Sequence, residues 1–262
     1  MPVTIHDLGK WKAAGRRFPV LTAYDYPTAK LLDRAGIPVL LVGDSLGQNV
    51  LGYETTLPVT MEEMLHHTRA VVRGAENALV VGDMPFLSYQ ASTADGIRNA
   101  GRFLKEGGAR AVKIEGAMVE QASALAERGI PVMGHVGLTP QSVHTMGGYR
   151  VQGKTEEAAA RLLDDALQLQ KAGVFALVLE GIPLELGKRI TESVSVPTIG
   201  VGAGPHTDGQ VLVLTDLLGI SDEPPKFAKS YAEIGDEVVR AARSFAEDVE
   251  AGRFPGEEHS YR

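Results

Sequence analysis

Four carboxylates of this chain directly follow short apolar runs. Asp44 follows VLLVG, Asp83 follows LVVG, Glu115 ends AVKIE and Glu180 ends FALVLE. Each run is typical of a buried parallel strand, so each acid is predicted at the carboxyl end of a strand, where α/β folds build their active sites. Lys113 lies two residues before Glu115. Together these residues predict a metal-assisted site that handles a proton.

Lys113 and Glu115 are predicted to point the same way, because side chains two residues apart share a face of a strand. Val112 and Ile114 would then face the surrounding helices. Buried charges are costly unless they are paired or used. Two interpretations follow: an internal ion pair that supports the fold, or Lys113 binding a substrate carboxylate while Glu115 orders the water shell of a metal.

Asp44 and Asp83 are candidates for metal ligands. Two carboxylates ~4 Å apart would repel by about 4 kcal/mol at an effective dielectric near 20. A divalent cation removes that penalty, and oxygen ligands in a chain without cysteine favour a hard ion such as Mg²⁺. The competing interpretation is that both residues are turn residues at strand ends or caps of helices.

Three further features could belong to the same site. Burial of Glu180 would raise its pKa, which suits a general base, whereas the alternative is a supporting or capping residue before Pro183. His135, in VMGHVGLTP, is predicted as a hydrogen-bonding core residue in preference to a catalyst. The run GVGAG, residues 200–204, follows the seventh expected strand, where barrels often bind phosphate. The run could therefore bind the phosphate group of a substrate, or it could simply turn the chain.

The elements that must position these residues alternate along the chain. Helical spacing marks residues 61–74, 93–106, 155–172 and 184–194, with N-caps expected at Thr60, Thr93 and Thr155 and a capping box only for the first, with Glu63. The expected strands are residues 20–23, 39–42, 79–81, 111–115, 131–135, 176–179, 197–201 and 211–214. Strands alternating with helices predict a parallel sheet.

Eight such units in 262 residues favour a closed (β/α)8 TIM barrel. A doubly wound sheet is the alternative, and it is disfavoured because no dinucleotide fingerprint opens the chain. A helix over 231–251 and a polar tail follow the eighth strand. Since no change of composition marks a linker, residues 1–262 are predicted to form a single barrel domain with a C-terminal helix and tail.

The composition of the chain argues against several classes of partner and several kinds of site. The formal net charge of −7 argues against a nucleic-acid surface, which needs a basic footprint. The absence of cysteine excludes disulfides, thiolate metal sites and cysteine nucleophiles, and it is compatible with the cytosol. No signal peptide is expected, and no apolar run approaches the ~20 residues of a membrane span. Nucleic-acid and membrane partners are therefore not expected, and a cytoplasmic location is compatible with these features.

The motifs resemble one known family over almost the whole chain. The segments LTAYDYPTAKL, VLLVGDSLG, TLPVT, VKIEG, GHVGLTPQSV, GGYRVQG, PTIGVGAG, TDGQVLV, PKFAK and FPGEEHS are similar to those of ketopantoate hydroxymethyltransferases. The resemblance implies a Mg²⁺-dependent barrel that transfers a hydroxymethyl group from 5,10-methylenetetrahydrofolate to 3-methyl-2-oxobutanoate. The product would be 2-dehydropantoate (ketopantoate), in pantothenate (vitamin B5) and coenzyme A biosynthesis. A homo-oligomer, commonly a homodecamer, is also implied.

The family's functional positions match individual residues of this chain. The implied metal positions are Asp44, Asp83 and Glu115, the last acting through water. The implied substrate-binding positions are Asp44, Ser45, Asp83 and Lys113. Glu180 matches the proton acceptor that forms a Mg-stabilised enolate, and His135 lies in a matching motif as an accessory residue.

Two rival functions share some of these features. A Mg²⁺-dependent α-oxoacid lyase or phosphonomutase on a related barrel would use the same enolate chemistry, but the family motifs argue against it. A barrel that only binds or scaffolds is the second rival. The intact set of Asp44, Asp83, Lys113 and Glu180 argues against it, because a scaffold has no need for buried charges.

Overall fold

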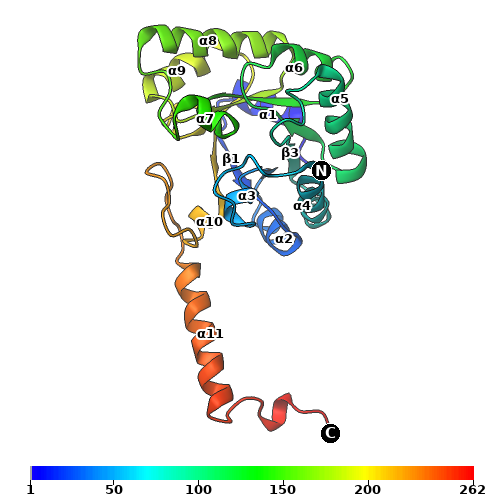
Figure 1. Cartoon of the computed structure of the whole chain (residues 1–262), viewed down its shortest axis with the longest axis vertical. Coiled ribbons are helices and arrows are strands. Elements are labelled where there is room, and N and C mark those ends of the chain that lie inside the picture. Colours follow the sequence, from blue (N-terminus) through cyan, green and yellow to red (C-terminus); the bar gives the residue numbers. More distant parts are fainter. Residues whose placement is uncertain (1) are drawn as a thin grey trace. The chain divides into compact units, whose positions relative to one another are not determined.

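The first of two compact units in this chain is a closed barrel. The computed structural model describes residues 2–262, and the chain divides into the units Met1–Leu212 and Val213–Arg262. In the first unit, eight parallel strands pair in sequence order and β1 pairs with β8 to close the barrel, with helices around it (Figure 1). The predicted (β/α)8 architecture is confirmed. A single domain over residues 1–262 stays a prediction.

All eight predicted strands are present, with ends that shift by at most two residues. They are β1 Phe18–Thr22, β2 Val39–Val42, β3 Leu79–Asp83, β4 Ala111–Lys113, β5 Val132–Gly137, β6 Ala176–Glu180, β7 Thr198–Val201 and β8 Gly209–Leu212. The prediction for the eighth strand was wrong at its end, because Leu214 begins helix α10 (Leu214–Leu217).

The register of the strands brings the predicted site residues close together. Asp83 of β3 is the direct partner of Lys113 in β4, and Gly137 of β5 is the partner of Glu180 in β6. Asp44 lies two residues beyond the end of β2, which pairs with β3. Since all strands run parallel, these carboxyl ends meet at one end of the barrel.

The first unit contains nine α-helices in its described residues. They are α1 Ile5–Ala13, α2 Tyr26–Arg34, α3 Leu46–Asn49, α4 Met61–Gly74, α5 Thr93–Arg102, α6 Val119–Ala126, α7 Val143–Met146, α8 Glu156–Lys171 and α9 Leu184–Ser193. After α5 the chain continues as one wider π-helical turn, Phe103–Gly107, which completes the predicted helix over 93–106.

The predicted N-caps are partly confirmed. Thr60 and Glu63 form the expected capping box at α4, and Thr155 accepts a hydrogen bond from the backbone of α8. At α5 the prediction was wrong by one residue, because the Ser92 hydroxyl accepts the hydrogen bond from the Asp95 N–H. Serine and threonine are both good caps, so the pattern alone does not choose between neighbours.

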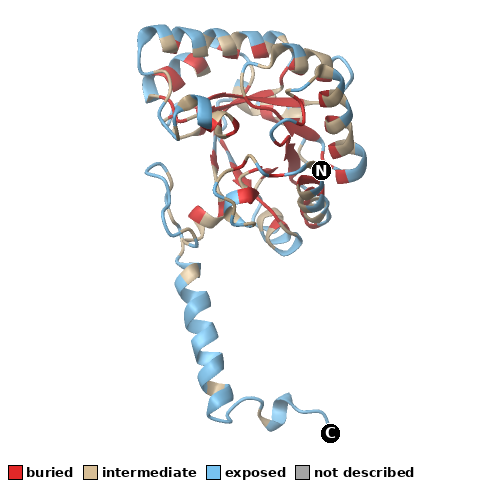
Figure 2. Cartoon of the chain, in the orientation of Figure 1, coloured by how far each residue is buried: buried red, intermediate tan, exposed pale blue. Residues whose placement is uncertain are grey.

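Two apolar layers hold the first unit together, and Figure 2 shows the strands as its most buried elements. One layer lies between the helices and the outside of the barrel, and Val112 and Ile114 belong to it, as predicted. The other fills the barrel interior and includes Leu8, which is fully buried. Because Leu8 packs with residues at the starts of several strands, α1 covers the amino end of the barrel. The predicted polar site residues lie at the opposite, carboxyl end of the barrel.

The second unit contains α10, the helix α11 (Ile234–Glu250) and a short turn at Glu257–His259. The predicted helix over 231–251 is confirmed with slightly narrower bounds. No residue of α11 is buried (Figure 2). Ile234, Val238, Phe245 and Val249 expose apolar side chains at helical spacing. Among residues 2–262, no helix combines the length and apolar character that crossing a membrane requires.

Candidate active site

A buried lysine lies among the carboxylates at the barrel mouth. The Nζ atom of Lys113 lies 2.8 Å from both carboxylate oxygens of Asp83 and 3.3 Å from Oε1 of Glu115. Burial disfavours the charged lysine, but Asp83 and Glu115 outweigh it and raise the Lys113 pKa well above its usual value. The predicted common orientation of Lys113 and Glu115 is therefore confirmed, and the lysine is held protonated.

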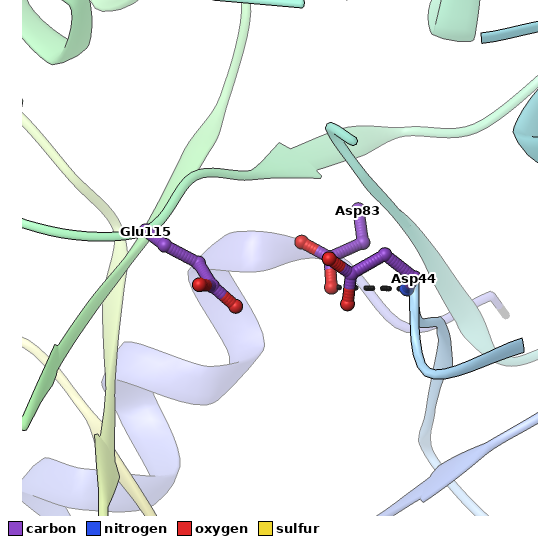
Figure 3. Close-up of side chains that lie close together, drawn as sticks. All are labelled: Asp44, Asp83 and Glu115. Atoms are coloured by element: carbon purple, nitrogen blue, oxygen red, sulfur yellow. Dashed lines mark hydrogen bonds between the residues drawn. The ribbon is translucent and has the colours of Figure 1, made fainter. Parts of the chain in front are cut away.

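Three of the predicted acids form one buried cluster. Oxygens of Asp44, Asp83 and Glu115 all lie within 4.8 Å of one another, and the residues are only 3%, 2% and 5% exposed. The Asp44 N–H donates to Oδ2 of Asp83 over 3.3 Å, and Glu115 points toward the pair from the neighbouring strand (Figure 3). Neither aspartate caps a helix, since Ser45 precedes α3 and Asp83 ends β3.

The cluster carries more negative charge than its neighbours balance. Burial and the charges of Asp83 and Glu115 raise the Asp44 pKa well above its usual value. Burial also raises the Asp83 pKa, although Lys113 opposes the shift. Such a set favours an added cation, and three carboxylates without nitrogen or sulfur donors match the preference of a hard ion such as Mg²⁺. The chemistry of the site therefore fits a divalent metal.

His135 lies between two of the acids. Its Nδ1 is 3.4 Å from Oε1 of Glu115 and its Nε2 is 3.3 Å from Oε2 of Glu180, although neither contact meets hydrogen-bond geometry. Burial and Lys113 disfavour the protonated ring, but the two glutamates outweigh them and raise the His135 pKa to about 9. The same surroundings act on Glu115: burial would raise its pKa, but Lys113 and His135 lower it to about 2.

Glu180 is the accessible acid of the site. Its side chain keeps 18% of its surface exposed, whereas that of His135 is 1% exposed. The structure therefore places His135 behind Glu180, in contact with the predicted base. The prediction of a simple core histidine missed this contact, because the spacing of residues along β5 and β6 does not reveal which side chains meet.

Ser45 directly follows Asp44 and directly precedes α3. Its hydroxyl lies 3.0 Å from the hydroxyl of Tyr24, which is itself buried. The Asn49 amide donates to the Ser45 carbonyl. Both contacts fix the serine beside the acid cluster.

Sequence reasoning missed two buried residues of the site, Tyr89 and Gln141. Gln141 lies in the turn after β5 and donates to the Asp44 carboxylate, while the Tyr89 hydroxyl accepts from the Glu115 N–H. Their motifs, MPFLSYQ and LTPQSV, contain no charged group that would have marked them. The only available signal was their location after strands β3 and β5.

The glycine run at the end of β7, residues 200–204, does not form an open loop that could bind a phosphate. The Gln210 amide donates to the carbonyl of Gly204 and to the hydroxyl of Thr207, and a side chain on Gly200 would collide with that same hydroxyl. The run is thus occupied by the protein's own side chains. This arrangement supports the simple-turn interpretation.

Solved structures share the fold at low sequence identity. A phosphonopyruvate hydrolase in complex with oxalate and Mg²⁺ aligns with a TM-score of 0.64 and 13% identity, over 98% of this chain and 93% of that chain. A 2,3-dimethylmalate lyase aligns with a TM-score of 0.60 and 17% identity, over 100% and 93%. These likenesses show a common barrel fold.

Relatives at much higher identity carry one name. A 3-methyl-2-oxobutanoate hydroxymethyltransferase of Geobacter metallireducens is 55% identical over 261 residues, 98% of either chain. One of Thermobifida fusca is 56% identical over 261 residues, 99% of this chain and 93% of the relative. The family described as Ketopantoate hydroxymethyltransferase matches residues 2–257. The chain therefore belongs to the ketopantoate hydroxymethyltransferase family.

Proposed function

We propose that this protein transfers a hydroxymethyl group from 5,10-methylenetetrahydrofolate to 3-methyl-2-oxobutanoate, forming 2-dehydropantoate for pantothenate biosynthesis in the cytoplasm. Family membership over residues 2–257 and the shared name of the relatives support this reaction. The structural observation that carries it is the buried cluster of Asp44, Asp83 and Glu115 around Lys113, with Glu180 at the mouth.

Asp44 and Asp83 would hold Mg²⁺ directly, and Glu115 would hold it through water. Their excess negative charge and all-oxygen donor set support this assignment. When bound, Mg²⁺ supplies Lewis-acid polarisation of the substrate's 2-oxo group and stabilises the negative charge of the enolate.

Lys113 and Ser45 would bind the oxoacid. Lys113 stays protonated because it lies against Asp83 and Glu115, so it can offset the charge of the substrate carboxylate. The Ser45 hydroxyl, fixed by Tyr24, can donate a hydrogen bond to the same group. Together they orient the oxoacid toward the acids with its C3 atom facing Glu180.

Glu180 would take the proton from C3. The electrons of the broken C–H bond pass into the enolate, whose C3 would then form a bond to the methylene carbon of the folate-derived iminium. The bond from that carbon to the folate nitrogen would then break, water would supply the hydroxyl group in its place, and tetrahydrofolate would leave with the remaining proton. His135 contacts the Glu180 carboxylate from the buried side and orients it. The exposed part of Glu180 faces the end where substrate enters, which suits a general base.

The protein would act as a homo-oligomer, with a homodecamer as the expected form. The apolar residues exposed along α11 support self-association, because contiguous exposed apolar surface marks interaction sites. Light scattering of the purified protein measures the state directly. A monomer at micromolar concentration would contradict this part of the proposal.

Proton NMR of 3-methyl-2-oxobutanoate in D₂O tests the reaction. With enzyme and Mg²⁺ alone, the C3 proton signal should disappear by exchange. Added methylenetetrahydrofolate should then produce a new hydroxymethyl signal, and EDTA should stop both changes. Exchange without product would refute the proposed acceptor, and the absence of both changes with folate present would refute the reaction.

A further inference from the structure

Gln141 connects three loops of the barrel mouth through one side chain: its own loop after β5 and the loops after β2 and β3. Its Nε2 donates to Oδ2 of Asp44 and to the carbonyl of Met84, each over 2.9 Å. Its Oε1 accepts from the Tyr89 hydroxyl and from the Gln90 amide, each over 2.8 Å. An amide offers two donors and two lone pairs, so all four hydrogen-bonding positions of this side chain are filled.

The orientation of that amide follows from its partners. The Met84 carbonyl can only accept and the Gln90 amide nitrogen can only donate, so a flipped Gln141 would face acceptor to acceptor and donor to donor. Gln141 is 5% exposed, so water would not replace a lost partner. The side chain is therefore locked in one orientation, with its donor fixed on Asp44.

The backbone of the same residue holds a second acid. The Gln141 N–H donates to Oε2 of Glu115 over 3.0 Å, and the Tyr89 hydroxyl accepts from the Glu115 N–H over 2.9 Å. Asp44 and Glu115 are far apart in sequence and follow different strands. Gln141 contacts one acid with its side chain and the other with its main chain, and Tyr89 contacts both Gln141 and Glu115.

We propose that Gln141 is a positioning residue that sets the carboxylates of Asp44 and Glu115 for a divalent cation. This inference rests on the metal site of the proposed function. By hydrogen bonding to Oδ2 of Asp44 and Oε2 of Glu115, Gln141 restrains the rotation of each carboxylate. The other oxygen of Glu115, Oε1, lies against Lys113 and His135. Partners that orient ligands in this way typically change metal affinity by ~10–100-fold when they are removed.

The test measures binding of Mn²⁺ to the metal-free full-length protein by electron paramagnetic resonance, which counts free Mn²⁺ without any turnover. Gln141→Met keeps the length and the backbone N–H but removes the amide. Gln141→Asn keeps an amide that is too short to reach Asp44. Both variants should raise the Mn²⁺ dissociation constant by ~10–100-fold while the fold is retained.

Gln170→Met is the matched control. The Oε1 atom of Gln170 accepts from the N–H groups of Ser195 and Val196, so it also fastens a loop to a helix, but it touches no carboxylate of the site. It should lower thermal stability and leave the Mn²⁺ dissociation constant within about twofold of wild type, because distant sites act independently.

Wild-type Mn²⁺ affinity in a folded Gln141 variant would overturn the proposal. Failure of both Gln141 variants to fold would assign the residue a structural role and would also overturn it. Absence of Mn²⁺ binding in the wild-type protein would instead refute the metal site of the proposed function, so the two failures are distinguishable.

Discussion

The Nε2 atom of His135 lies 3.3 Å from Oε2 of Glu180. The opposite ring nitrogen lies 3.4 Å from Glu115, so one buried imidazole connects the proposed base to the acid cluster. Since the His135 pKa is raised to about 9, the ring is positively charged at neutral pH and faces two carboxylates. His135 therefore contacts Glu180 on its buried side, while part of the Glu180 side chain stays exposed.

Glu180→Gln should abolish exchange of the C3 proton while the oxoacid still binds. The amide keeps the shape of the side chain but cannot accept the proton, and general bases typically contribute ~10²–10⁴-fold. NMR exchange in D₂O gives the rate, and ligand-observed NMR gives the binding. Glu192→Gln, at an exposed position on the following helix α9, is the control and should exchange at the wild-type rate. Unchanged exchange in Glu180→Gln would remove this residue from the role of base.

Asp83→Ala should weaken Mg²⁺ binding by at least ~10-fold, because it removes a proposed ligand. Calorimetric titration of the metal-free protein measures the change. Asp208→Ala is the matched control, because Asp208 also pairs with a lysine, Lys12, at 2.8 Å but lies outside the acid cluster. A Mg²⁺ titration of Asp83→Ala that overlays the wild type would sink the ligand assignment.

The fold could be predicted from the sequence because apolar periodicity and parallel-strand geometry are local. The runs before Asp44 and Asp83 are apolar on both faces, which is typical of strands covered by helices. Two-residue spacing also predicted that Lys113 and Glu115 point the same way, and the structure confirms it. These features depend only on residues that are close together in the sequence, so the sequence pattern is enough to predict them.

Contacts between loops could not be predicted in this way. Gln141 meets Asp44 across 97 positions of sequence, and Tyr89 meets Gln141 across 52. Such contacts depend on the barrel closing and on loop conformations that no periodicity specifies. His135 was predicted on the correct strand, but its contact with Glu180 depends on the register of β5 with β6.

Lys113→Met should lower the free energy of unfolding by about 3–5 kcal/mol in EDTA, because it leaves Asp83 buried without its cation and Glu115 with only His135 opposite it. Mg²⁺ should restore more stability to this variant than it adds to the wild type, since the metal then supplies the missing positive charge. Urea unfolding in EDTA and in Mg²⁺ measures both effects. Lys12→Met breaks the ion pair with Asp208 and should show no enhanced response to Mg²⁺. Wild-type stability of Lys113→Met in EDTA would contradict the prediction.

Asp33 should make stability depend on pH outside the active site. Its carboxylate joins α2 to the start of β3 by accepting from the Asn77 N–H at 2.9 Å and the Ala78 N–H at 2.7 Å. Partial burial would raise its pKa, but these hydrogen bonds lower it below the usual 3.8. Ionised Asp33 therefore stabilises the fold above that value, and the contribution disappears as the pH falls through the folded-state pKa.

Asp33→Asn should cost about 1 kcal/mol near pH 7, a value reduced by partial exposure, and the cost should shrink below pH 3.8. Asp165→Asn is a control of opposite sign. Burial and the neighbouring Asp164 raise the Asp165 pKa, so its charged form destabilises the fold at neutral pH and the variant should be more stable there. Urea unfolding between pH 3 and 7 separates the two curves. A constant difference between Asp33→Asn and wild type across this range would show that its hydrogen bonds do not favour the ionised carboxylate.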